Sequence, residues 1–125
     1  MTSETTILVV DDDELIRIAT RSMLSQHGFQ VLEAVDGHDA LRMQREQPAE
    51  LWLLDICMPN CDGLEAIQLL RKENTSLPVI CMSTPPNTNE IDYTKIAVKF
   101  GANLSLYKPF TEKQLLAAIN SLQLP

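Results

Sequence analysis

The chain has 125 residues, a length that suits one domain with a single hydrophobic core. Its 17 acidic residues against 10 basic ones give a formal net charge of -7, which argues against direct nucleic-acid binding, and no apolar run reaches the roughly 20 residues needed to span a bilayer. The first residues carry no basic and apolar leader and the three cysteines are odd in number, so we expect a soluble domain in a reduced, cytoplasmic setting.

Short apolar runs alternate with segments of helical period, a pattern that predicts five βα units around a parallel sheet. Strands are expected at residues 6–10, 30–34, 51–54, 79–82 and 104–107. Helices are expected at about 15–27, from the turn at 36–37 to 46, at 64–72 and 90–100, and from a capping box at Thr111 to about 122. The apolar repeat of the first helix begins at Leu15, and Gly28 is expected to end that helix. The pattern therefore predicts one doubly wound α/β domain without a linker.

Polar residues follow the predicted strands directly. They are Asp11, Asp12 and Asp13 after the first strand, Asp55 after the third, Ser83 and Thr84 after the fourth, and Lys108-Pro109 after the fifth. In sheets of this kind ligands bind beyond the carboxyl ends of the strands. Neighbouring carboxylates repel one another, and Mg²⁺ relieves this repulsion with the oxygen ligands that it prefers; Mn²⁺ is a substitute. With a lysine and a hydroxyl at the same edge, this set of residues suits phosphoryl transfer to an aspartate.

Each of these residues also has a simpler interpretation when it is taken alone. Asp13 is more simply the N-cap of the next helix, and Asp11 or Asp12 can serve as caps or turn residues. A Lys-Pro pair after a strand is commonly a surface turn. Cys57 and Cys61 could form half of a zinc site, but no histidine lies near them in the sequence and a second pair is missing. It is therefore the joint occurrence of these polar residues at one edge of the sheet that indicates a phosphoryl-transfer site.

In this ordered set the chain resembles the receiver domains of two-component response regulators, including the chemotaxis receivers. The resemblance rests on Ile7 to Asp13, on Leu54 to Gly63, on Pro78 to Ser83, and on Gly101-Ala102 followed by Tyr107 to Phe110. It covers nearly the whole chain. It implies one receiver domain over residues 1–125, with a flavodoxin-like three-layer sandwich and five parallel strands in the order 2-1-3-4-5.

The resemblance also implies a role for each site residue. Asp55 would accept a phosphoryl group from a sensor histidine kinase or a histidine phosphotransfer protein, while Ser83 and Lys108 would bind the phosphoryl oxygens. Mg²⁺ would be held by Asp11, Asp12, Asp55 and the backbone carbonyl of Cys57. Gly63 would admit a backbone conformation that other residues avoid, and the Lys108-Pro109 bond would be cis.

As a receiver, the domain would be a signalling switch and not an enzyme in the usual sense. Phosphorylation would change its binding to an effector domain or to a downstream protein. A homodimer through the fourth helix, the fifth strand and the last helix is one arrangement that the resemblance allows, and no membrane contact is expected.

Several positions depart from the usual receiver pattern. Ser105 stands where receivers commonly carry an aromatic residue, and we expect Tyr107 to face the other side of the strand and not to replace it. Pro85-Pro86 predicts either a tolerated surface insertion or a stiffened switch loop. Thr84 is an alternative to Ser83 as the hydroxyl donor. Because Cys57 and Pro85 are uncharged where receivers set the lifetime of the phosphoryl group, we expect slow self-dephosphorylation.

Two other classes of function stay open at this point. One is a metal-dependent phosphatase or phosphotransferase for small molecules, although Ile56-Cys57 after Asp55 supplies no second acid or base. The other is a receiver-like scaffold that binds partners without phosphorylation, which the changes at Ser105 and Pro85 favour. Incubation with acetyl phosphate and Mg²⁺ separates all three.

Overall fold

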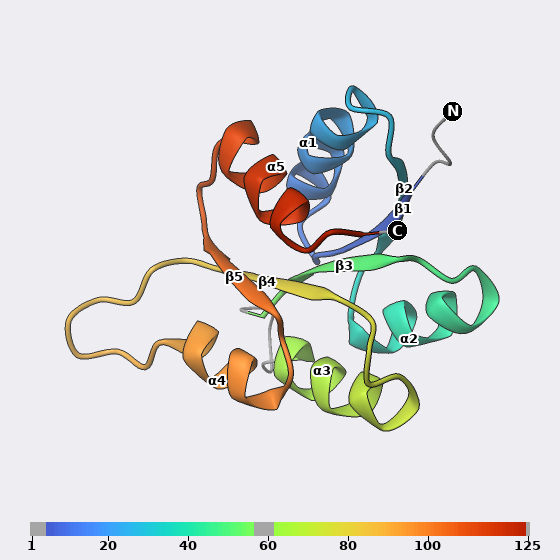
Figure 1. Cartoon of the computed structure of the whole chain (residues 1–125). Helices are drawn as coiled ribbons and strands as arrows, with labels where there is room; N and C mark the ends of the chain where they lie inside the picture. Colours follow the sequence, from blue (N-terminus) through green and yellow to red (C-terminus); the bar gives the residue numbers. More distant parts are fainter. Residues whose placement is uncertain (1–4, 57–61, 125) are drawn as a thin grey trace.

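A five-stranded parallel sheet lies between two layers of helices in the computed structural model, which describes residues 5–56 and 62–124 (Figure 1). The elements in chain order are β1 (Thr6–Val10), α1 (Glu14–Ser25), β2 (Gln30–Ala34), α2 (Gly37–Glu46), β3 (Leu51–Asp55), α3 (Asp62–Glu73), β4 (Val79–Ser83), α4 (Tyr93–Phe100), β5 (Leu104–Tyr107) and α5 (Glu112–Ser121). The strand order is β2-β1-β3-β4-β5. The predicted flavodoxin-like fold and its strand order are confirmed.

The three central strands β1, β3 and β4 are buried because helices cover both faces of the sheet. Ile7, Val9 and Leu53 pack beneath α1 and α5, where Leu24 and Leu115 close the cluster. On the other face, the cluster that contains Trp52 and Leu54 packs against α2, α3 and α4. Such two-sided burial explains why these three strands read as continuous apolar runs and not as alternating ones.

The apolar repeat of α1, which begins at Leu15, does not lie entirely on the buried side of the helix. Thr20 and Leu24, which lie four positions apart and therefore on one side of the helix, are buried. Leu15 lies one position away from that row and is 77% exposed, and Ile18 is 52% exposed. The side of α1 that carries Thr20 and Leu24 faces the sheet, whereas Leu15 and Ile18 lie on the exposed side.

Two helix boundaries differ from the prediction. α1 ends at Ser25, because the N–H groups of His27 and Gly28 donate to carbonyls three residues back and tighten the last turn, before Gly28 reverses the chain with a φ of 85°. α4 begins at Tyr93 and not near Glu90, because Asp92 takes the N-cap position. Glu90 instead closes a turn with Asn87.

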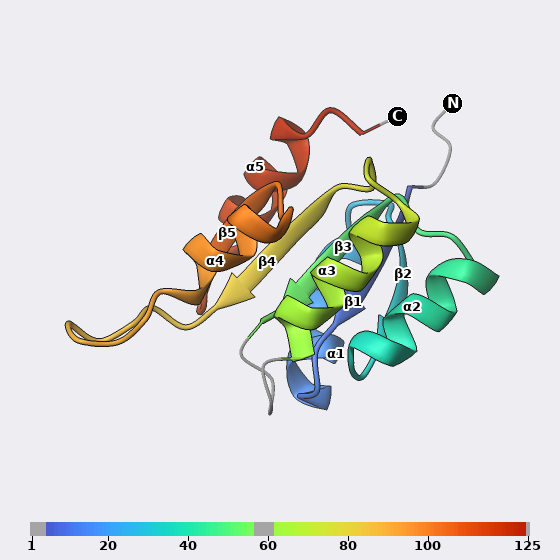
Figure 2. The same ribbon diagram turned by 90° about the horizontal axis from the view of Figure 1, so that it is seen from below.

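Parallel strands bring all five carboxyl ends to one edge of the sheet. β3 and β4 are each one residue longer than predicted, so Asp55 and Ser83 are the last residues of their strands and not the first residues of loops. Both views show the connection from β4 to α4 projecting from the body at this edge (Figures 1 and 2). No helix in the described part of the chain is both long and apolar enough to cross a membrane.

Candidate functional site at the carboxyl edge of the sheet

Three carboxylates converge where β1 and β3 end. Asp11 follows β1 and Asp55 ends the neighbouring strand β3, so both are carried by the sheet and both are buried. Asp12 is exposed at the rim. One oxygen from each of Asp11, Asp12 and Asp55 lies within 4.8 Å of the others. The structure therefore brings together the three acidic residues that the sequence singles out, and their oxygens form a donor set of the kind that hard cations prefer.

Lys108 supplies positive charge to this cluster from the end of β5. Its Nζ lies 2.9 Å from Oδ2 of Asp11 and 3.4 Å from Oδ2 of Asp55. Burial by itself lowers the pKa of the Lys108 ammonium, but the hydrogen bond to Asp11 and the charges of Asp55 and Asp11 outweigh burial, so the pKa lies above its ordinary value. Lys108 therefore stays protonated and bridges two of the three carboxylates.

Ser83 lies at the end of β4, between β3 and β5. It is buried, its hydroxyl donates to the carbonyl of Thr84 at 3.0 Å, and its carbonyl accepts from the Lys108 N–H at 2.8 Å. Thr84 is exposed. Of the two hydroxyl residues, Ser83 is thus the one buried at the end of its strand.

Arg17 fixes the backbone that carries Asp11. Its Nη1 donates to the carbonyl of Asp11 at 2.7 Å, while its Nε donates to Glu33 on β2 at 3.1 Å. Within the loop, the N–H of Asp13 donates to Oδ1 of Asp11 at 2.9 Å. Sequence reasoning missed Arg17; the available signal was its place one helical turn after Asp13 at the start of a predicted helix.

The sequence model for the response regulator receiver domain matches residues 7–120 of the chain. The chain belongs to this family. As a family, receivers are signalling switches of two-component systems that bind Mg²⁺ in an acidic pocket and interact with histidine kinases and effector domains.

Named relatives and solved structures agree with this assignment. Response regulator MprA of Mycobacterium leprae is 37% identical over 117 residues, which cover 93% of this chain and 50% of MprA. Protein PilH of Pseudomonas aeruginosa is 35% identical over 117 residues, covering 92% of this chain and 94% of PilH. The chain thus spans about half the length of the MprA proteins and nearly the whole length of PilH.

Among solved structures, chemotaxis protein CheY4 of Vibrio cholerae superposes with a TM-score of 0.85 at 26% identity, covering 95% of this chain and 98% of CheY4. The receiver domain of NtrX from Brucella abortus gives a TM-score of 0.83 at 31% identity, covering 94% of this chain and 98% of that domain.

Tyr107 corrects one sequence expectation for this receiver. Residues two apart on a strand share a face, and both Ser105 and Tyr107 are exposed while Leu104 and Leu106 pack inward. Tyr107 therefore lies on the same side of β5 as Ser105, and the expectation that it faces the other side is wrong. Its hydroxyl donates to Oδ2 of Asp92 at 2.6 Å.

Gly63 is required for a different reason from the one expected. Its backbone does not have a positive φ, but a Cβ at this position would lie 2.5 Å from the Cα of Ile56 and 2.6 Å from the carbonyl oxygen of Asp55. The first turn of α3 thus packs directly on the end of β3. The Lys108-Pro109 bond is cis, as expected. The backbone carbonyl of Cys57 and the Cys57–Cys61 pair lie outside the described residues.

Asp13 starts α1, in agreement with the simpler interpretation of this residue. Its Oδ1 accepts from the N–H groups of Leu15 at 2.9 Å and Ile16 at 3.4 Å. Removing an N-cap typically costs about 1 kcal/mol. We therefore expect Asp13→Ala to lower the free energy of unfolding by about 1 kcal/mol in a urea titration. Asp13→Asn, which retains a capping oxygen, is the matched control and should lose much less.

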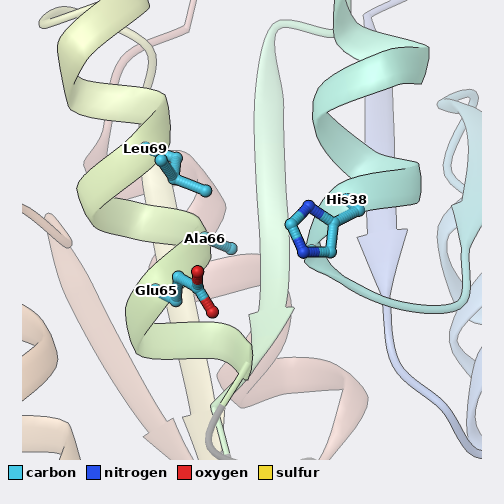
Figure 3. Close-up of a pocket in the computed structure, with 5 residues that line it drawn as sticks. His38, Glu65, Ala66 and Leu69 are labelled. Atoms are coloured by element: carbon cyan, nitrogen blue, oxygen red, sulfur yellow. The ribbon is translucent and has the colours of Figure 1, made fainter.

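Two hollows differ in what they can hold. The hollow between α2 and α3 has a volume of about 10 Å³, too little for more than about one water, and Figure 3 shows His38 on one side of it and Glu65, Ala66 and Leu69 on the other. A groove of about 440 Å³ lies beside Lys108, between Ile16 and Met23 of α1 and Phe110 after β5. Only the second adjoins the carboxylate cluster.

Proposed function

We propose that this receiver accepts a phosphoryl group on Asp55 from a sensor histidine kinase or a histidine phosphotransfer protein, in a Mg²⁺-dependent reaction that switches partner binding or output. The main support for the proposal is that the ammonium of Lys108 bridges Asp11 and Asp55 at the edge where three carboxylates meet. Residues 1–125 would form the receiver domain.

The donor set fits the metal that the family binds. Asp11, Asp12 and Asp55 offer only carboxylate oxygens, which suit Mg²⁺ or Mn²⁺ and not a thiolate-preferring metal. In the proposal these three residues hold the ion, and the backbone carbonyl of Cys57 adds a fourth oxygen. When bound, Mg²⁺ would neutralise charge on the carboxylates and on the transferring phosphoryl group.

Asp55, Lys108 and Ser83 have different roles in the proposed transfer. An Oδ of Asp55 forms a bond to phosphorus as the bond from phosphorus to the donor imidazole nitrogen breaks, and that nitrogen leaves with the electron pair and takes up a proton. An ionised aspartate needs no general base for this step. Lys108 supplies a fixed positive charge to the phosphoryl oxygens, and the hydroxyl of Ser83 turns from the Thr84 carbonyl to donate to one of them.

The surroundings of the site support a protein donor. Ile16 and Met23 of α1 line the groove beside Lys108, and Leu15 and Ile18 add exposed apolar surface on α1. A donor docked on α1 would bring its phosphohistidine to the rim. On the output side we propose an effector domain or a downstream protein, and α4, β5 and α5 as the surface of a homodimer. A cytoplasmic location belongs to the same proposal, since the donor kinases act there.

The test is incubation with acetyl phosphate and Mg²⁺ followed by intact-mass measurement. We expect a gain of one phosphoryl group, lost in Asp55→Ala and in EDTA, and retained by Asp12→Asn only at raised Mg²⁺ concentration. After removal of the donor, the phosphoryl group should persist for minutes, in line with an uncharged and exposed Pro85. Turnover of small phosphate esters would instead indicate an enzyme. An unchanged mass would indicate a scaffold, and either result would contradict the proposal.

A further inference from the structure

Tyr107 of β5 lies close to both ends of the connection between β4 and α4. In the sheet, Tyr107 is the register partner of Ser83, the residue from which this connection departs, and the neighbouring Lys108 N–H donates to the Ser83 carbonyl at 2.8 Å. At the other end, the Tyr107 hydroxyl donates to Oδ2 of Asp92 at 2.6 Å. Tyr107 is therefore paired in register with the residue just before the connection and hydrogen-bonded to the residue just before α4.

Asp92 is the residue that starts α4. Its Oδ1 accepts from the N–H of Thr94 at 3.1 Å and from the Thr94 hydroxyl at 2.5 Å. The hydrogen bonds from Thr94 and then Tyr107 lower the pKa of Asp92, so the acceptor is ionised at neutral pH and the bond from Tyr107 is charge-assisted. This bond therefore holds the first turn of α4 against β5.

The rest of the connection is weakly held. Thr84, Pro85 and residues 87–91 are exposed, and the segment projects from the body (Figures 1 and 2). The Ser83 hydroxyl donates to the Thr84 carbonyl, so a turn of Ser83 toward a phosphoryl group on Asp55 breaks a contact to the first residue of the connection. Within the connection Asn87 and Glu90 close a turn, and at the far end the hydrogen bond from Tyr107 to Asp92 joins it to β5.

We propose that the hydrogen bond from Tyr107 to Asp92 is the regulatory latch of this receiver: it is closed while Asp55 is unmodified, and phosphorylation of Asp55 opens it and releases the first turn of α4. The latch rests on the proposed function, since it reports the state of Asp55. It also gives a role to Tyr107 in a chain that carries Ser105 at the usual aromatic position.

Thermodynamic linkage fixes the sign of the effect expected for a variant without the latch. If a phosphoryl group weakens the latch, then removal of the latch must favour the phosphorylated state by the same factor. Beryllium trifluoride binds a carboxylate oxygen as a phosphoryl analogue, so its affinity in the presence of Mg²⁺ measures that state at equilibrium. We expect Tyr107→Phe to tighten its binding about threefold or more.

The experiment compares the parent chain with Tyr107→Phe and with the matched control Tyr93→Phe. The control also removes a tyrosine hydroxyl beside the N-cap of α4, but the side chain of Tyr93 packs on the apolar cluster that contains Trp52. Calorimetry gives the affinity for beryllium trifluoride, and hydrogen exchange gives the protection of the Thr94 and Lys95 amides. In the parent and in Tyr93→Phe, the ligand should speed exchange of these amides. In Tyr107→Phe, exchange should be fast already and unchanged by the ligand.

Asp92→Asn is a second variant that keeps a capping oxygen while removing the charge, and it should shift both readouts in the same direction. The latch is refuted if Tyr107→Phe binds beryllium trifluoride like the parent and still shows the full change in exchange. Should the parent chain itself fail to bind beryllium trifluoride and fail to take up a phosphoryl group, the proposed function falls and the latch falls with it. The first result leaves the proposed function standing, so the two failures are distinguishable.

Discussion

Replacing Lys108 by methionine is expected to slow phosphorylation of Asp55 by acetyl phosphate about 100-fold or more, and at the same time to tighten Mg²⁺ binding. The loss of rate follows from removing the fixed positive charge that we propose to face the phosphoryl oxygens, an effect of the size seen when one oxyanion donor is deleted. Methionine keeps most of the apolar stem of the lysine, so the packing around residue 108 changes little.

The gain in Mg²⁺ affinity follows from the same geometry. The Lys108 ammonium lies 2.9 Å from Asp11 and 3.4 Å from Asp55, where it competes with a cation for their oxygens. A unit charge a few ångströms from a divalent ion costs on the order of several kcal/mol at an effective dielectric constant of about 20, before relaxation and screening reduce it. We therefore expect the dissociation constant of Mg²⁺ to fall about tenfold.

The two effects are separated by measuring Mg²⁺ binding by calorimetry without a phosphodonor, and phosphorylation by intact mass at saturating Mg²⁺. Lys113→Met on the exposed surface of α5 is the matched control and should leave both quantities unchanged. Lys108→Arg, which retains the charge, should leave Mg²⁺ affinity near the parent value. A Lys108→Met variant that binds Mg²⁺ less tightly than the parent would contradict this competition.

The convergence of Asp11, Asp55 and Lys108 could be predicted from the sequence because it depends only on topology. Asp11 and Asp55 follow apolar runs that read as buried strands, and Lys108 follows the strand expected at residues 104–107. Parallel strands end at one edge, so the assignment of the strands places the three residues at that edge. Long stretches of chain separate each from the next, yet no side-chain detail is needed. The resemblance to receivers adds the order of the strands.

Contacts between loop side chains could not be predicted in this way. Tyr107 and Asp92 lie 15 residues apart, and their hydrogen bond depends on where α4 begins. The residues before α4 have no apolar period, so the sequence places the start of the helix too early, near Glu90, and does not reveal the partner of Tyr107. Arg17 escapes prediction for a similar reason, since its bond to the Asp11 carbonyl joins a helix to a loop that has no period of its own.

The reason for a glycine at position 63 could not be predicted from the sequence, because it is the short distance to neighbouring backbone atoms and not a positive φ. A Cβ on residue 63 would meet two backbone atoms, the Cα of Ile56 and the carbonyl oxygen of Asp55. These atoms cannot move aside easily, since β3 is paired on both sides and the Ile56 N–H donates to Met82 on β4 at 3.0 Å. The conflict must therefore push α3 away from the sheet.

Gly63→Ala is accordingly expected to lower the free energy of unfolding by about 3 kcal/mol, at the upper end of the usual cost of overpacking. Urea titrations followed by the fluorescence of Trp52, the one tryptophan in the chain, give this value. Because the displaced turn packs on the residue that we propose to be phosphorylated, the rate of phosphorylation by acetyl phosphate should fall as well, even under conditions where the variant is fully folded.

Gly28→Ala separates crowding from backbone strain. A Cβ at Gly28 would meet nothing within 4 Å, but the φ of 85° there costs an L-residue about 1 kcal/mol. Gly28→Ala should therefore destabilise the chain by about 1 kcal/mol and leave the rate of phosphorylation unchanged. If the two alanine variants lose equal stability and phosphorylate equally fast, then the contact of α3 with the end of β3 does not position Asp55.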